Sequence, residues 1–194
     1  MRREDALAIL RDSDALLTGH FVLSSGLHSP NYLQCAKVQQ HPDRLEKLCR
    51  ALAEGLKGTP VTAVIGPAMG GIVLAYELAR QLGARAMFME RNDSGRFELR
   101  RGWTAGPEDR ILVAEDVVTT GGSAREVMDV LVAAGANVVG VASLVCRNRE
   151  VDFGVPYRYV IDFNIPAYTC EECPLCKQGL PAVKPGSRPA KKGA

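Results

Sequence analysis

The sequence predicts an α/β fold: a parallel sheet of about five strands with helices on both faces, preceded by a small N-terminal β-hairpin. Short apolar runs recur along the chain and suit strands that are buried on both faces of a sheet. Amphipathic stretches at helical spacing alternate with these runs, and glycine-rich turns join the two. At 194 residues the chain is long enough for one domain with a sizeable core. The strands are expected at 61–65, 84–89, 111–114, 138–145 and 157–163.

The remaining elements follow in chain order. A helix is expected over residues 3–17, where apolar residues recur at roughly helical spacing. Residues 18–33 form two β-like pieces around a Ser/Gly/Pro turn, which is typical of an edge hairpin. Further helices are expected at 42–56, which has Pro42 near its first turn, at 72–82 and at 124–132.

The chain divides into a domain, residues 1–167, and a cysteine-containing tail, residues 168–194, whose end from Lys184 has the composition of a disordered segment. A net charge of +2 gives no electrostatic reason to expect nucleic acid as the main partner. The N-terminus carries charges throughout, unlike a signal peptide, and no apolar run approaches membrane-spanning length. We therefore expect a cytoplasmic protein that binds neither nucleic acid nor a membrane.

Residues 111–123 contain the motif around which the chain is organised. An apolar strand, 111–114, runs into the carboxylates of Glu115 and Asp116, and a loop of hydroxyl residues and glycines follows. Ser123, with Glu126 three residues later, fits a capping box at the start of the next helix. Backbone N–H groups of a first helical turn bind phosphate well, and neighbouring carboxylates accept hydrogen bonds from sugar hydroxyls. The alternative is a buried strand, an acidic turn and a capped helix without a ligand.

This motif resembles the phosphoribosyl-pyrophosphate (PRPP) signature of type I phosphoribosyltransferases. The resemblance implies that Glu115 and Asp116 bind the ribose hydroxyls and are catalytic residues. It also implies that the following loop binds the 5-phosphate. That loop comprises Val117, Val118, Thr119, Thr120, Gly121, Gly122 and Ser123.

Two more segments match the family in the same order along the chain. Residues 66–71 join a strand to a helix and resemble the pyrophosphate loop, with Ala68, Met69 and Gly70 as PRPP-binding residues and a cis peptide between Ala68 and Met69. Taken alone, this segment fits an ordinary βα turn equally well. Residues 90–102, here called the basic loop, otherwise have the composition of a solvated hairpin. In the family a mobile loop closes over pyrophosphate in the neighbouring subunit's site, which implies a homodimer with shared active sites.

In the basic loop, Arg91 matches a basic position of the family and is expected to bind PRPP and act in catalysis. Arg96, Arg100 and Arg101 add positive charge at positions that align only loosely. Mg²⁺ is the implied cofactor, held mainly through PRPP rather than by direct protein ligands.

The N-terminal hairpin resembles one branch of the family, the orotate phosphoribosyltransferases, in which it forms a hood over the base. The hood is expected over residues 18–35. The resemblance implies transfer of ribose 5-phosphate from PRPP to N1 of orotate, giving orotidine 5′-monophosphate and pyrophosphate in pyrimidine synthesis. A planar guanidinium at residue 147 suits a carboxylated pyrimidine. The implied orotate-binding residues are Ser24, Ser25, Gly26, Tyr32, Thr119 and Arg147.

The chain also departs from the family. Known members carry lysines where this chain has Ser24 and Gly70, and their mobile loops contain lysines and a histidine, whereas residues 90–102 contain only arginines as basic residues. These differences leave two alternatives open: a phosphoribosyltransferase for another base, purine or pyrimidine, and a regulatory module that senses PRPP.

Three of the six cysteines, Cys35, Cys49 and Cys146, lie in apolar surroundings typical of core thiols. The others, Cys170, Cys173 and Cys176, are spaced as candidate zinc ligands. A structural zinc site needs four ligands, so the fourth would have to be distant in sequence or come from another chain.

Overall fold

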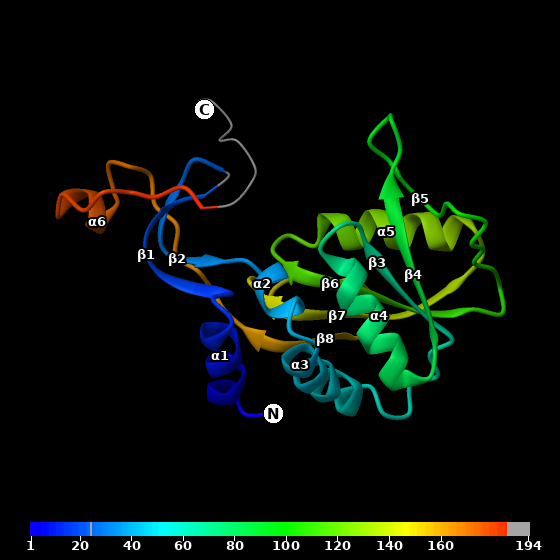
Figure 1. Cartoon of the computed structure of the whole chain (residues 1–194). Coiled ribbons are helices and arrows are strands. Elements are labelled where there is room, and N and C mark those ends of the chain that lie inside the picture. Colours follow the sequence, from blue (N-terminus) through cyan, green and yellow to red (C-terminus); the bar gives the residue numbers. More distant parts are fainter. Residues whose placement is uncertain (24, 186–194) are drawn as a thin grey trace.

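The computed structural model describes residues 1–23 and 25–185 and has a six-stranded central sheet in the order β5-β4-β3-β6-β7-β8 (Figure 1). Five strands run parallel, as the sequence predicts, and the short edge strand β5 pairs antiparallel with β4. The strands are β3 (Ala63–Pro67), β4 (Arg85–Arg91), β5 (Phe97–Glu98), β6 (Arg110–Val118), β7 (Asn137–Cys146) and β8 (Tyr157–Asp162).

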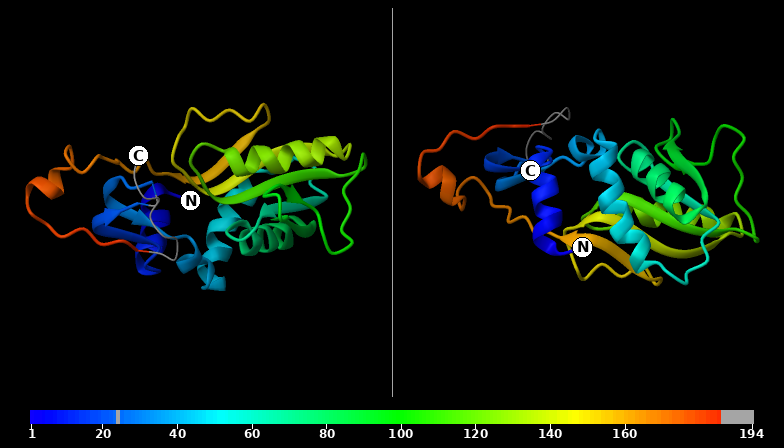
Figure 2. Two further views of the ribbon diagram at one scale, coloured as in Figure 1. Left: turned by 90° about the horizontal axis from the view of Figure 1, so that it is seen from above. Right: turned by 60° about the horizontal axis from the view of Figure 1, so that its bottom comes forward.

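The core lies on both faces of this sheet, and β6 shows why its apolar run is continuous. Leu112 and Ala114 pack toward α3 (Pro42–Gly55) and α4 (Gly71–Leu82), while Ile111 and Val113 pack toward α5 (Gly122–Ala133). These four side chains are fully buried. Figure 2 shows α5 on one face of the sheet and α3 and α4 on the other. A strand buried on both faces cannot alternate apolar with polar residues, and this confirms the buried-strand prediction.

The N-terminal helix is shorter than predicted. Helix α1 (Arg3–Asp12) ends five residues early, and Leu16 and Leu17 begin β1 (Leu16–Val22) instead. Asp14 has a left-handed backbone conformation, with φ of 53°, which no helix continues through. Arg44 of α3 donates to the Asp12 carbonyl at 2.7 Å and so satisfies one acceptor at the helix end. No helix in the described part of the chain is both long and apolar enough to cross a membrane.

The predicted capping box at the start of α5 is wrong. The helix begins at Gly122, and Gly121 precedes it with φ of 79°, so Ser123 already lies in the first turn. Glu126 instead forms an ion pair with Arg91, with an N–O distance of 2.7 Å. A left-handed residue favours glycine, and a Cβ at Gly121 would also lie 2.8 Å from the Phe153 ring.

The predicted hood is an antiparallel hairpin of β1 and β2 (His28–Leu33), and the C-terminal segment folds back onto it (Figure 1). Tyr168 exchanges both backbone hydrogen bonds with His28, each at 2.8 Å. Val183 accepts from Val22 at 2.9 Å and donates to His20 at 2.8 Å. Two short helices complete the chain, α2 (Ala36–Gln39) after the hood and α6 (Pro174–Lys177) in the tail.

The division into 1–167 and 168–194 stays a prediction, although the described part of the tail pairs with both hood strands. Most of the segment predicted to be disordered, residues 186–194, lies outside the described residues.

Candidate active site

A cavity of about 1200 Å³ opens at the carboxyl ends of β3, β6 and β7, where ligands of open α/β sheets gather, and the hood contributes to its wall. Most of the predicted site residues line it. They are Ser25 and Tyr32 of the hood, Ala68, Met69 and Gly70 after β3, Glu115, Asp116 and Val117 at the end of β6, Thr119 after β6, Ser123 at the start of α5, and Arg147 after β7.

The acid pair lies at the end of β6, on the cavity wall. One carboxylate oxygen of Asp116 accepts from the backbone N–H of Val117 at 2.9 Å, which fixes the orientation of the group. Burial, and to a lesser extent the negative charge of Asp116, raise the pKa of Glu115 to about 7, although a hydrogen bond from Ser123 opposes both effects. Glu115 can therefore donate or accept a hydrogen bond near neutral pH, and both carboxyls can bind sugar hydroxyls.

The loop after β3 packs against the acid pair without an intervening side chain. A Cβ at Gly70 would lie 2.7 Å from both carboxylate oxygens of Asp116. Gln39 of α2 donates to the Gly70 carbonyl at 3.0 Å, and the Ala68 N–H donates to Met89 of β4 at 2.8 Å. The peptide between Ala68 and Met69 is cis, as the resemblance implied. The loop thus brings its backbone directly to the carboxylates.

The loop between β6 and α5 provides the candidate phosphate site. Thr119 and Ser123 line the cavity, and the first turn of α5 begins at Gly122. The N–H groups of a first helical turn have no partner within the helix and favour an anion. Four predicted loop residues do not line the cavity. Val118 is fully buried in the core, Thr120 is exposed, and Gly121 and Gly122 form the turn into the helix.

Arg147 also lines the cavity, directly after β7. Its Nε atom is buried and has no hydrogen-bond partner among the described residues. Burial lowers the pKa of this guanidinium, although not enough to neutralise an arginine. A buried donor without a partner is costly, and a planar oxyanion such as a carboxylate would satisfy it.

Comparison with known proteins identifies the family. The phosphoribosyl transferase domain model matches residues 36–165. An orotate phosphoribosyltransferase of Heliobacterium modesticaldum is 54% identical over 192 residues, covering 97% of this chain and 100% of the relative. One of Caldanaerobacter subterraneus subsp. tengcongensis is 51% identical over 189 residues, covering 97% of this chain and 99% of the relative. The chain belongs to the orotate phosphoribosyltransferase family.

The fold agrees with that of a solved structure in the family. The crystal structure of orotate phosphoribosyltransferase from Aeropyrum pernix superposes with a TM-score of 0.70 at 26% identity, covering 80% of this chain and 92% of that one. The type I phosphoribosyltransferase fold predicted from the sequence is therefore confirmed.

The basic loop of this family member does not reach its own cavity. Arg91 pairs with both carboxylate oxygens of Glu126 on α5, at 2.7 and 3.2 Å, and lies 4.0 Å from the centre of the Phe97 ring. Arg101 pairs with Glu90 at 2.6 Å and Arg100 with Glu98 at 3.3 Å. Among the described residues that line the cavity, none comes from 90–102.

Of the hood residues proposed to bind the base, Ser25 and Tyr32 line the cavity, whereas Gly26 lies in the hairpin turn with φ of 87°. Ser24 lies outside the described residues. Gln39 and Lys184 also line the cavity, and neither was predicted from the sequence. Neither has a local signal: Gln39 belongs to a four-residue helix, and Lys184 reaches the site through tail–hood pairing.

Proposed function

We propose that the protein transfers ribose 5-phosphate from PRPP to N1 of orotate, giving orotidine 5′-monophosphate and pyrophosphate. The observation that carries this proposal is the convergence on one cavity of an acid pair, a helix N-terminus and an arginine whose buried Nε has no hydrogen-bond partner among the described residues. Relatives near 50% identity over almost the whole chain carry the name of this activity, which supports the same assignment here.

The proposed chemistry needs positioning and electrostatics rather than a protein nucleophile. As the bond between the anomeric carbon and pyrophosphate breaks, positive charge develops on the ribose ring. N1 of orotate then bonds to that carbon, and the N1 proton passes to the departing pyrophosphate or to water. Asp116, oriented by the Val117 N–H, and Glu115 hold the ribose hydroxyls and favour that charge. The first turn of α5, with Thr119 and Ser123, holds the 5-phosphate.

On the base side, Arg147 offers a buried donor to the orotate carboxylate, and Tyr32 and Ser25 of the hood face the same cavity. On the leaving-group side, the backbone of Ala68, Met69 and Gly70 is available to pyrophosphate. The tight packing of Gly70 on Asp116 holds the pyrophosphate subsite next to the ribose-hydroxyl subsite.

Mg²⁺ is the proposed cofactor, and the donor set fits it. Glu115 and Asp116 supply hard oxygen atoms at the cavity wall, and Mg²⁺ prefers oxygen ligands with several positions left to water or substrate phosphates. The ion would be held mainly through PRPP oxygens, with these carboxylates beside it rather than as direct ligands. When bound, Mg²⁺ neutralises charge on the departing pyrophosphate.

We also propose a homodimer in which the basic loop serves the neighbouring site. Three large apolar side chains lie exposed in the loop after β3 and on the helix that follows it: Met69 is 81% exposed, Val73 46% and Tyr76 65%. Val73 and Tyr76 are three residues apart on α4 and share a face. A second copy would cover this face, and a loop that misses its own cavity fits a role across such an interface.

The six free thiols fit the proposed cytoplasmic location.

An orotate-depletion assay with PRPP and Mg²⁺, run on wild type and Asp116→Asn, tests the function. We expect turnover by wild type and loss of most activity in the variant. Parallel assays with uracil, hypoxanthine and adenine test the alternative bases. Faster turnover of one of them than of orotate would identify that base as the substrate instead. PRPP binding without turnover of any base would show that the protein is a PRPP sensor rather than an enzyme. An unchanged rate in Asp116→Asn would remove that residue from the site.

A further inference from the structure

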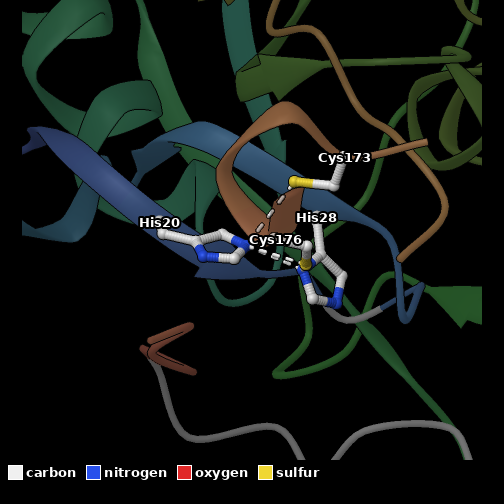
Figure 3. A group of neighbouring side chains, drawn as sticks. All are labelled: His20, His28, Cys173 and Cys176. Carbon is white, nitrogen blue, oxygen red and sulfur yellow. Dashed lines mark hydrogen bonds between the residues drawn. The ribbon is translucent and has the colours of Figure 1, made fainter. Parts of the chain in front are cut away.

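Two tail cysteines and two hood histidines meet at one point, away from the active-site cavity. Cys173 directly precedes α6 and Cys176 lies within it, whereas His20 and His28 lie on β1 and β2. Their four potential ligand atoms all lie within 4.8 Å of one another. Figure 3 shows the two sulfur atoms and the two imidazole rings gathered together.

The separations resemble the edges of a tetrahedron around zinc. Zn–S bonds of about 2.3 Å and Zn–N bonds of about 2.0 to 2.1 Å give S–N edges of about 3.5 Å. The His20 Nε2 atom lies 3.6 Å from Cys173 Sγ and 3.7 Å from Cys176 Sγ, and His28 Nδ1 lies 3.2 Å from Cys176 Sγ. The two histidine nitrogens are 2.8 Å apart and need to separate by about half an ångström for an ideal N–N edge.

The surroundings of the cluster also suit a metal site. The other ring nitrogen of His20, Nδ1, lies 2.8 Å from the Leu180 carbonyl. A proton on Nδ1 leaves the lone pair of Nε2 directed at the cluster, and metal-binding histidines usually donate their other ring N–H to a carbonyl in this way. Cys173 is fully buried and His20 is only 7% exposed, although a thiol and an imidazole both carry polar atoms.

We propose that His20 Nε2, His28 Nδ1, Cys173 Sγ and Cys176 Sγ bind one structural zinc ion. Two thiolates and two imidazoles in tetrahedral array favour zinc over magnesium or calcium, which prefer oxygen ligands. The four protein ligands close the coordination sphere, so the ion has a structural rather than a catalytic role. The ion ties residues 173–176 to both hood strands, next to the Tyr168–His28 backbone pair.

This ligand set revises the candidate set drawn from the cysteine spacing alone. Cys170 is exposed, and its sulfur lies 3.6 Å from that of Cys176. Cys170 is not among the residues whose potential ligand atoms all lie within 4.8 Å of one another, so we leave it out of the ligand set. One histidine supplies the fourth ligand that the cysteine triplet lacked, and the other takes the place of Cys170. His20 lies 153 residues before Cys173, and His28 lies 148 residues before Cys176.

Metal analysis of the purified full-length chain tests the proposal. We expect about one zinc ion per chain in wild type and in Cys170→Ser, and almost none in His20→Ala or Cys173→Ser. Co²⁺ exchanged into wild type should show the visible bands of tetrahedral cobalt with thiolate charge transfer. A chelator should lower the Tm of wild type but leave that of Cys173→Ser unchanged.

Three outcomes would overturn the proposal. Folded wild type without bound metal, even after incubation with Zn²⁺, would leave the cluster as a hydrogen-bonded contact. A Cys170–Cys176 or Cys173–Cys176 disulfide in the purified chain would replace the metal with a covalent bond. Loss of zinc from Cys170→Ser, with zinc retained in His20→Ala, would assign the ion to the three cysteines.

The tail carries a second feature, independent of the metal. Val183 is hydrogen-bonded to His20 and Val22 of β1, and the next residue, Lys184, lines the active-site cavity. Among the described lining residues, Lys184 and Arg147 are the only cations. The two proposed substrates carry a carboxylate, a phosphate and a pyrophosphate. We infer, on the basis of the proposed function, that the Lys184 ammonium binds one of these substrate anions.

Kinetics of Lys184→Ala and Lys184→Arg test this role, with Lys57→Ala as a control outside the cavity. We expect Lys184→Ala to raise one substrate KM by about tenfold with a smaller change in kcat, and Lys184→Arg to restore most of it. A rise in the KM for orotate assigns the carboxylate, and a rise in the KM for PRPP assigns a phosphate. Unchanged KM and kcat values in an active Lys184→Ala enzyme would refute the role of Lys184 and leave the proposed function intact. An inactive wild type would refute the proposed function.

Discussion

Gly70 and Asp116 are in direct contact at the cavity wall, and the contact leaves no room for a side chain at residue 70. A Cβ at that position would lie 2.7 Å from each carboxylate oxygen and 2.8 Å from the carboxyl carbon. The backbone of Gly70 is right-handed helical, with φ of −62° and ψ of −33°, a conformation that any residue adopts. Glycine is therefore required by the neighbouring carboxylate rather than by the backbone.

Gly70→Ala should therefore impair catalysis without unfolding the protein. The methyl group would displace the Asp116 carboxylate, and a misplacement of this kind costs about tenfold to a hundredfold in kcat/KM. Steady-state kinetics with orotate and PRPP, with thermal unfolding in parallel, measures both effects. Gly106→Ala is the matched control, because Gly106 also lacks a positive φ and a Cβ there would meet nothing within 4 Å. Equal activity of the two variants would contradict the proposed contact.

Glu115→Gln should make the free energy of unfolding less dependent on pH. The pKa of Glu115 is raised to about 7 in the folded protein, so the proton is bound more tightly there than in the unfolded chain. The resulting stabilisation is complete below the unfolded pKa near 4.5 and is lost as pH rises through about 7. The whole loss is on the order of 3 kcal/mol, because a tenfold change in proton affinity corresponds to about 1.4 kcal/mol.

Unfolding measured at pH 5 and pH 8 tests this effect. The drop in stability between the two pH values should be smaller in Glu115→Gln than in wild type. Glu108→Gln, at an exposed loop position, serves as the control and should behave as wild type does. An identical drop in all three proteins would show that Glu115 has an ordinary pKa.

Arg147→Ala should weaken binding of the base and leave PRPP binding nearly unchanged. Loss of a charged hydrogen bond in a buried site costs about 1.5 to 3 kcal/mol, or about tenfold to a hundredfold in the KM for orotate. Arg147→Lys should recover little, because an ammonium cannot pair bidentately with a carboxylate. Arg149→Ala, which removes an exposed ion pair with Asp162, is the control. A larger effect on the KM for PRPP would move Arg147 to the phosphate side.

The proposed sharing of the basic loop predicts complementation between two inactive variants. In a hybrid dimer of Arg91→Ala and Asp116→Asn, the subunit with an intact Asp116 receives an intact Arg91 from its partner. Random pairing gives hybrids in half of the dimers, each with one working site, so about one quarter of wild-type activity should return. Co-expression of two differently tagged chains followed by activity assay measures it. Additive residual activities alone would place Arg91 in its own subunit's site.

Local patterns in the sequence predicted most of the fold. The continuous apolar run of β6 reports burial on both faces, and all five parallel strands were expected within a few residues of their observed bounds. The predicted end of α1 was wrong because Leu16 and Leu17 continue the helical spacing. Only the left-handed turn at Asp14 and the contact with Arg44 end the helix there.

Contacts between residues far apart in the sequence could not be predicted from such local patterns. The resemblance named Glu115, Asp116 and Arg147 because they follow strands in a recognisable order, and the structure brings them to one cavity. Nothing local relates His20 to Cys173, which meet only because the tail folds back onto the hood. Lys184 reaches the cavity through the same pairing, so its position depends on tertiary structure rather than on any spacing in the sequence.

A crystal structure with bound orotidine 5′-monophosphate tests the central claim most directly. We expect the phosphate in the turn of Thr119–Ser123, the ribose hydroxyls on Glu115 and Asp116, and the base carboxylate on Arg147. A nucleotide bound with its phosphate elsewhere and the turn at the start of α5 empty would contradict the account.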